Sequence, residues 1–167
     1  MKIRHSKSED YNKISSVMNG WWGGREMAHL LPRLFFDHFN DTSFVIEKEQ
    51  KIVGFLIGFL SQSKPNEAYI HFVGVHPEYR QDGVGTQLYY SFFEHVQKRG
   101  INIVTAITSP INKRSIAFHS RLGFQMVQGD KEVDGVPVFS DYDGHGNERV
   151  VFKRNLRNHT RRYSDGF

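Results

Sequence analysis

Residues 76–88 read HPEYRQDGVGTQL and combine a short turn with the start of a helix-like segment. Arg80, Gly83 and Gly85 lie within the turn. A helix begins with about four unpaired backbone N–H groups and roughly half a positive charge, and glycines let a backbone approach a phosphate closely. The stretch therefore predicts a phosphate or pyrophosphate site over residues 80–86. The alternative is an ordinary glycine-rich turn that caps a helix.

Two familiar phosphate motifs do not fit this turn. A dinucleotide-binding fingerprint that begins at Gly83 needs a third glycine at the position of Leu88. A P-loop needs a lysine and then a serine or threonine after its last glycine, whereas Gly85 is followed by Thr86 and Gln87. The turn therefore belongs to neither class of nucleotide-binding motif.

The composition sets further limits. A length of 167 residues suits a single domain, and 38% hydrophobic residues, with 14% aromatic, indicate a globular chain. The absence of cysteine excludes disulfides, a thiol nucleophile and thiolate-bound zinc. The start has no apolar signal region, and no apolar run approaches the roughly 18 residues of a membrane span. A cytoplasmic protein without membrane contacts is expected.

The formal net charge is +4, from 22 Lys and Arg against 18 Asp and Glu. Part of this excess lies near the C-terminus, where residues 158–167 are expected to form a basic tail after a domain over residues 1–157. Such a tail is interpreted as a solvated terminus, with a nucleic-acid contact or an oligomer arm as alternatives. Because the rest of the chain is near neutral, nucleic acid is not expected as a partner, and a homodimer is left open.

Hydrophobic periodicity predicts the order of the elements. A strand is predicted at residues 2–6, a helix from Ser8 as its cap to Gly20, and a second helix over 27–39. The later elements are a hairpin over 42–60, a strand over 68–77, a helix over 83–100, a strand over 101–108, a helix over 112–124, and strands at 125–128 and 149–156, with a polar insertion over 129–148. This alternation predicts an α/β chain in which helices cover a mixed sheet.

Two segments resemble motifs of the GCN5-related N-acetyltransferases, a superfamily that moves an acetyl group from acetyl-CoA to an amine. Residues 73–88 match its motif A at Arg80, Gly83 and Gly85. Residues 112–124 match its motif B at Asn112, Phe118, Gly123 and Phe124. The resemblance covers residues 1–157. It implies a mixed, mostly antiparallel central sheet flanked by helices, with strands splayed at the acetyl-CoA site.

The resemblance also implies the residues that bind acetyl-CoA. The turn formed by Arg80, Gln81, Asp82, Gly83, Val84, Gly85 and Thr86 would hold the pyrophosphate through backbone amides. On the preceding strand, Val73, Gly74 and Val75 would pair with the pantetheine arm and the acetyl carbonyl. Asn112 would contact the pantetheine arm.

Catalytic residues are implied at two further positions. His119 stands where most relatives have the tyrosine that protonates the departing CoA thiolate, so His119 is the expected acid, with a packing role as the alternative. His71 stands at a position where relatives often have the general base, and Glu67 is the alternative candidate for the base. Strand alternation predicts that Tyr69, His71, Val73 and Val75 share one face. The alternative for His71 is a half-buried ring bonded to a backbone carbonyl.

The segment WWGGR at residues 21–25 joins two predicted helices. In the family this connection lines the acceptor site, which implies that Trp21 and Trp22, together with Tyr69, wall a pocket and that Arg25 binds an anionic group. The alternative is a tryptophan pair in the core. The amine acceptor, a small molecule or a peptide, is not fixed by the sequence.

No metal is expected. Residues 141–148, DYDGHGNE, lack the twelve-residue spacing of a calcium loop, and the nine histidines form no His-Glu-x-x-His pattern. The leading hypothesis is an N-acetyltransferase that uses acetyl-CoA as cosubstrate and transfers the acetyl group directly in a ternary complex. The alternatives are a non-catalytic acyl-CoA-binding or regulatory module of the same fold, or a nucleic-acid-binding domain.

Overall fold

The computed structural model describes residues 1–158, so the predicted basic tail lies outside the described residues apart from Asn158. The described residues form a seven-stranded sheet in the order β1-β2-β3-β4-β5-β9-β6, in which only β4 and β5 run parallel. The strands are β1 Lys2–His5, β2 Phe44–Lys48, β3 Lys51–Leu60, β4 Glu67–Val75, β5 Ile103–Thr108, β6 Gln125–Met126 and β9 Val150–Asn155. The predicted mixed, mostly antiparallel sheet is confirmed.

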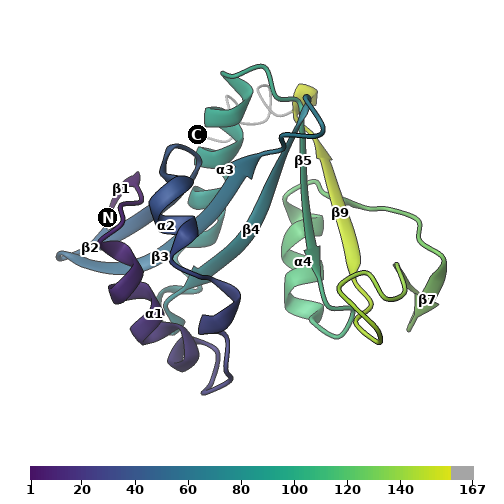
Figure 1. Ribbon diagram of the computed structural model, residues 1–167, viewed down its shortest axis with the longest axis horizontal. Coiled ribbons are helices and arrows are strands. Elements are labelled where there is room, and N and C mark those ends of the chain that lie inside the picture. Colours follow the sequence, from purple (N-terminus) through teal and green to yellow (C-terminus); the bar gives the residue numbers. More distant parts are fainter. Residues whose placement is uncertain (159–167) are drawn as a thin grey trace.

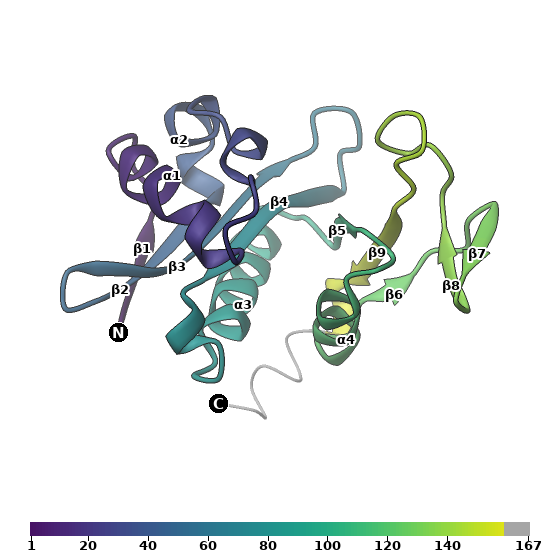
Figure 2. The same cartoon turned by 90° about the horizontal axis from the view of Figure 1, so that it is seen from below.

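Helices cover both faces of the sheet, with α1 and α2 on one side and α3 and α4 on the other (Figure 2). They are α1 Asp10–Trp21, α2 Leu34–His38, α3 Val84–Gln97 and α4 Lys113–Arg121, with 3-10 turns η1 Ala28–Leu30, η2 Asn40–Thr42, η3 Pro77–Tyr79 and η4 Leu156–Asn158. Within the described residues, no helix combines the length and the apolar character needed to cross a membrane.

Two details of the first helices differ from the prediction. The single helix predicted over residues 27–39 is wrong, because η1 and α2 are separate; Pro32 lies between them and lacks the N–H that would continue a helix. Ser8 is not the cap of α1. The helix begins at Asp10, and the Ser8 hydroxyl instead donates to the carbonyl of Phe36.

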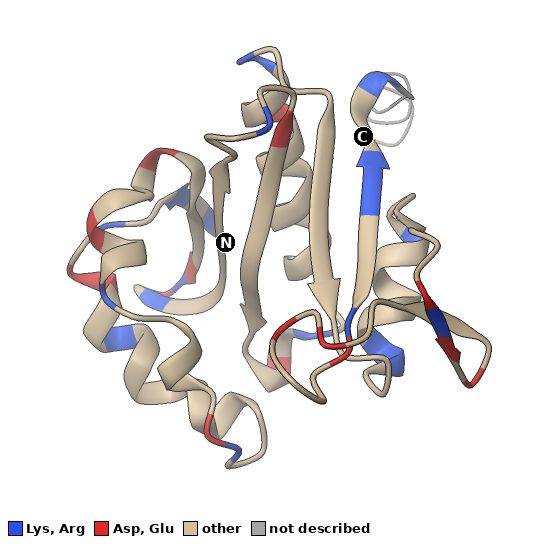
Figure 3. Cartoon of the chain, turned by 45° about the vertical axis from the view of Figure 1, so that its right-hand side comes forward, with Lys and Arg blue, Asp and Glu red and all other residues tan. Residues whose placement is uncertain are grey.

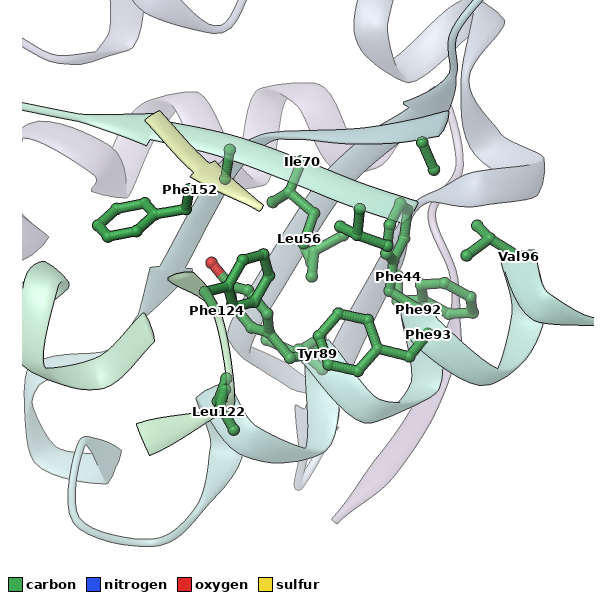
Figure 4. Close-up of a cluster of buried hydrophobic side chains, with 14 of the residues drawn as sticks. Phe44, Leu56, Ile70, Tyr89, Phe92, Phe93, Val96, Leu122, Phe124 and Phe152 are labelled. Carbon is green, nitrogen blue, oxygen red and sulfur yellow. The ribbon is translucent and has the colours of Figure 1, made fainter. Parts of the chain in front are cut away.

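Hydrophobic clusters on both faces of the sheet hold the layers together. The predicted inner face of α3, formed by Leu88, Phe92, Phe93 and Val96, is fully buried against the sheet (Figure 4). Each side chain of this kind contributes about 1.5–3 kcal/mol when it is fully buried. A second cluster around Phe55 holds α1 and α2 on the opposite face.

Strands β4 and β5 pair only at their first residues. Glu67 to Tyr69 pair with Ile103 to Thr105, and the two strands then diverge (Figure 1). Among the described residues, the β5-facing edge of β4 from Ile70 to Val75 therefore has no strand partner. The splayed strands implied by the family resemblance are confirmed.

A β-bulge interrupts β4 at His71. Ile57 of β3 pairs with Phe72, but the next residue, Gly58, pairs with Ile70, so His71 has no partner on β3. The predicted alternation is therefore wrong beyond this point, because an extra residue changes which face the following side chains point to. Tyr69 and His71 lie on the face of α1 and α2, whereas Val73 and Val75 pack with the cluster beneath α3.

The polar insertion contains a hairpin that the sequence analysis missed. Its strands, β7 Lys131–Val133 and β8 Val136–Val138, are joined by Asp134 and Gly135, whose φ angles are 51° and 80°. Two successive positive φ values are typical of a type I′ turn, which an Asp-Gly pair favours. The run Val-Asp-Gly-Val was the local signal for this hairpin.

Candidate active site

The free edge of β4 offers backbone groups to a ligand. The N–H of His76 donates to the carbonyl of Val53 on β3 at 2.8 Å. Successive N–H groups along a strand point to alternate sides. The N–H groups of Val73 and Val75 therefore point away from β3, into the gap between β4 and β5, whereas that of Gly74 points toward β3. An extended pantetheine arm can add to such an edge as a further strand.

The turn before α3 lies at the end of this edge. Gly83 precedes the helix with a φ of 75°, and nothing lies within 4 Å of the point where a side-chain Cβ would sit. The first amides of α3 have no acceptor within the helix. Val84 is buried; the more accessible residues are Gln81, Asp82, Gly83, Gly85 and Thr86. These features fit the pyrophosphate of acetyl-CoA.

Two side chains predicted to bind the cofactor form bonds within the protein. The Arg80 guanidinium donates from Nε to the carbonyl of Val75 at 3.3 Å and from Nη2 to the carbonyl of Trp21, at the end of α1. Asn112 caps α4, since its side-chain oxygen accepts the N–H of Ser115 at 3.2 Å. A direct contact of either residue with acetyl-CoA stays a prediction.

The ring of His71 is held by one hydrogen bond and one stacking contact. Its Nε2 lies 2.8 Å from the carbonyl oxygen of Leu30, and its ring stacks on Phe35 with the centroids 4.2 Å apart. A carbonyl only accepts, so Nε2 carries the proton and Nδ1 of the neutral ring keeps a lone pair. Burial lowers the pKa of His71 below its ordinary value, against smaller opposing effects of the Leu30 bond and of Asp143. The ring is therefore neutral at pH 7.

Glu67, the reserve base, lies at the opposite end of β4. Its carboxylate is 4.0 Å from the Lys64 ammonium. Six residues separate Glu67 from Val73, which is about 20 Å along an extended strand. Glu67 therefore lies far from the free edge at Val73, and the role of His71 as the base stays a prediction.

His119 lies in the core rather than at an open surface, with 6% of its surface exposed. Its Nδ1 donates to the carbonyl of Ser115 at 2.7 Å, so Nε2 is the acceptor for the hydroxyl of Tyr89 at 2.8 Å. The ring also stacks on Phe152, with the centroids 4.4 Å apart. Burial lowers the pKa of His119, opposed by the Ser115 bond. These contacts favour the packing role, and the acid role stays a prediction.

The WWGGR segment divides between core and surface. Trp21 is buried with 7% exposure and stacks on Phe55, as in the core alternative. Trp22 is half-buried and lies against β4, where a Cβ on Gly74 would come within 2.8 Å of its indole ring. Arg25 is exposed. Trp22 and Arg25 therefore remain the candidates for acceptor contacts.

A cavity of about 370 Å³ opens where β4 and β5 pair. It is lined by side chains from β3, β4, β5 and β9, among them Tyr69, and by Tyr142 of the loop before β9. Such a volume is at the small end of ligand sites. Among residues 1–158, no three His, Asp or Glu side chains gather in a group that could hold a metal ion.

A model of the acetyltransferase (GNAT) family matches residues 9–124, more than half of the chain. The chain belongs to this GNAT family. An L-2,4-diaminobutyric acid acetyltransferase of Virgibacillus pantothenticus is 33% identical over 79 residues, which covers 47% of this chain and 50% of that protein. The chain spans half or less of the length of the diaminobutyric acid acetyltransferases and of the Methanocaldococcus relative that it matches.

Solved GNAT structures share the fold. Naa20 of Chaetomium thermophilum, in complex with a bisubstrate analogue, has a TM-score of 0.74 at 18% identity and covers 97% of this chain and 90% of its own. The diaminobutyrate acetyltransferase EctA of Paenibacillus lautus, with its substrate and coenzyme A, has a TM-score of 0.65 at 19% identity and covers 90% and 93%. At these identities the likeness concerns the fold alone.

Sequence reasoning missed the partner of His119 and most of the cavity. Tyr89 lies 30 residues before His119, and no local pattern pairs the two. The cavity collects residues from four strands, so it depends on the sheet order rather than on any motif.

Proposed function

We propose that the protein transfers the acetyl group of acetyl-CoA to a primary amine of a small molecule, by direct attack in a ternary complex. The observation that carries this proposal is that the free edge of β4 ends where α3 begins. One extended ligand could pair with Val73 and Val75 and place its pyrophosphate on the turn at residues 81–86. The small cavity volume and the name of the Virgibacillus relative support a small amine.

The acceptor must lose a proton before it attacks, because an alkyl amine has a pKa near 10. The Nδ1 lone pair of His71 accepts that proton, directly or through a water. Acetyl-CoA supplies the thioester carbon, to which the amine nitrogen bonds as the carbon–sulfur bond breaks and CoA thiolate departs. The nitrogen then loses its second proton, which passes through water to the thiolate. The free N–H groups of Val73 and Val75 can donate to the carbonyl oxygen as negative charge develops there.

The departing thiolate does not require a strong acid, since thiols have a pKa near 8.5. His119 would have to be protonated in order to donate, and its burial opposes protonation. Protonation of the thiolate by water is therefore the simpler route, with His119 as the alternative acid.

The second candidate is a non-catalytic acyl-CoA-binding module, which the replacement of the family's usual tyrosine by His119 favours. Thiol release separates the two candidates, because a binding module would take up acetyl-CoA without releasing CoA. The chain has no cysteine, so a thiol reagent would detect only the CoA that is set free.

The cofactor site is tested by a matched pair of glycine variants. Gly83 and Gly100 both have positive φ angles, 75° and 83°, and at neither residue does another atom lie within 4 Å of the position that a Cβ would take. The strain of a valine should therefore be similar at both positions. Gly83→Val should raise the acetyl-CoA Kd at least about tenfold by blocking close approach, and Gly100→Val, at the far end of α3, should not. Equal Kd values in the two variants would remove the turn from the site.

A further inference from the structure

Three polar side chains form a row across the sheet inside the cavity. Tyr69 of β4 pairs with Thr105 of β5, which pairs with Lys153 of β9, and all three line the cavity. Val104 and Phe152, which immediately precede Thr105 and Lys153 in the sequence, are buried beneath α3. Because side chains alternate along a strand, the row points to the opposite face, that of α1 and α2. Strands lie about 4.8 Å apart, which makes the row about 10 Å wide. We call it the donor row, because its members are two hydroxyls and an ammonium.

The charge of the donor row is positive. Lys64 and Glu67, the other charged residues of the cavity lining, lie 4.0 Å from each other. Lys153 has no ion pair with any residue in the described part of the chain. Burial raises the pKa of Tyr69 to about 12, and nearby Tyr142 and Asp143 add to the effect, so the phenol stays a neutral donor. An anionic group is the complement of such a row.

An apolar pair lies beside the donor row, two residues further along β5 and on the neighbouring part of β9. Ile107 of β5 pairs with Val151 of β9, and both line the cavity. His71 lies two residues beyond Tyr69 on β4, which is about 7 Å along a strand. The distance from His71 to the donor row is therefore roughly 7 Å at Tyr69, which lies on the same strand, and roughly 12 Å at Lys153, which lies two strands away.

The electrostatics of the loop before β9 agree with this arrangement. Asp143 of this loop acts on both His71 and Tyr69. Arg149, which forms an ion pair with Asp143 at 3.4 Å, opposes its effect at Tyr69. Figure 3 shows acidic residues in the loop and basic residues on β9. A protonated amine is therefore favoured at the base end and an anion at the β9 end.

We propose that the acceptor is an amino carboxylate in which an apolar spacer separates the amine from the carboxylate by roughly 7–12 Å. Its amine lies at His71, its spacer lies over Ile107 and Val151, and its carboxylate binds the donor row. This inference rests on the proposed function for the identity of the amine end, but the carboxylate site can be tested by binding alone.

Two probes of the same shape isolate the carboxylate. 4-(Aminomethyl)benzoate carries an amine and a carboxylate at opposite ends of a ring. In 4-(aminomethyl)benzamide an uncharged amide of similar shape takes the place of the carboxylate. Calorimetry on the CoA-loaded protein should show about tenfold tighter binding of the acid than of the amide, the scale of one charge-assisted contact. Lys153→Met should reduce this ratio below about threefold. Lys51→Met, an exposed lysine at the start of β3, should keep it.

Lys153 is exposed, so its replacement should leave the fold intact. Lys153→Glu offers a second test, because it should reverse the order and make the amide the better ligand. An acid-to-amide ratio near one in the wild type, or a ratio that Lys153→Met does not change, would overturn the inference. Thiol release is measured separately with both probes. If the acid binds in a way that depends on Lys153 but no thiol is released, the proposed function is refuted and the carboxylate site stands. If the acetyl group is transferred but binding does not depend on Lys153, the carboxylate site is refuted and the proposed function stands.

Discussion

Replacing His119 by phenylalanine tests whether this buried ring is structural or catalytic. The substitution keeps an aromatic ring against Phe152 but removes the acceptor of the Tyr89 hydroxyl, 2.8 Å away. Tyr89 is only 2% exposed, so its hydroxyl would lose its partner without gaining water. An unpaired buried group of this kind costs about 1–3 kcal/mol. His119→Phe should therefore lower the free energy of unfolding by about that amount.

A double-mutant cycle separates the hydrogen bond from the packing. Tyr89→Phe alone leaves Nε2 of His119 without its donor and should cost a similar amount. The pair Tyr89→Phe and His119→Phe removes both polar groups, so its cost should be smaller than the sum of the two single costs by at least about 1 kcal/mol. Additive costs would refute the hydrogen bond as the source of the stability.

The pH dependence of stability gives an independent test. Because burial lowers the pKa of His119 in the folded state, the contribution of its neutral form is complete above the unfolded pKa of about 6.5 and is lost as the pH falls from there toward the folded pKa. Each pH unit in this window costs up to about 1.4 kcal/mol per proton. His71 adds a second such proton, since its pKa is lowered as well. His119→Phe should remove one of these two contributions to the pH dependence of stability.

The measurement is urea unfolding, followed by tryptophan fluorescence, at pH 7.5, 6.5 and 5.5. The unfolding free energy of His119→Phe should fall less steeply below pH 6.5 than that of the wild type, by up to about 1.4 kcal/mol per unit. Thiol release by the variant should stay within about threefold of the wild type, because the thiolate leaves fairly well without a side-chain acid. Parallel stability curves together with a lost basic limb in the pH profile of kcat would refute the structural reading and restore the acid role.

Two further predictions concern the acceptor side. His71→Gln keeps a side-chain N–H for the Leu30 carbonyl but has no base; kcat should fall about 10²-fold, and the acidic limb of its pH profile should disappear. That limb should lie below about pH 6.5 in the wild type, because burial lowers the pKa of His71; an unchanged profile would exclude His71 as the base. For an acceptor whose anionic group binds at the WWGGR segment rather than at the donor row, Arg25→Ala should raise the acceptor KM and leave the acetyl-CoA KM nearly unchanged, since it removes uniform binding of that group. The opposite pattern in steady-state kinetics would move the WWGGR segment to the cofactor side.

The parts of the fold that the sequence predicted depend on neighbours in the chain. The turn before α3 was predictable because glycine conformation and the free amides of a helix start are local properties. The inner face of α3 followed from the helical period of its apolar residues. The splay of β4 and β5, in contrast, came only from the family resemblance, because nothing within either strand shows where its pairing ends.

The parts that the sequence analysis missed or mispredicted depend on distant residues. The bulge at His71 is a property of the pairing with β3, where Gly58 follows Ile57, so alternation along β4 alone predicted the wrong face for Val73 and Val75. The same limit explains the donor row, since Tyr69, Thr105 and Lys153 become neighbours only when β5 lies between β4 and β9.

The position of the cofactor turn depends on a close approach that no motif describes. A Cβ on Gly54 of β3 would lie 2.5 Å from the Val84 side chain, at the first residue of α3. Gly54 also pairs with Val75, the last residue of β4. The missing side chain therefore allows the start of α3 to pack directly beside the end of the free edge. Because the amides that would bind a pyrophosphate must lie in line with the strand that would bind pantetheine, this contact links the packing of the core to the geometry of the site. We therefore expect glycine at position 54 to be required for the proposed acetyl-CoA site, although it would touch no ligand.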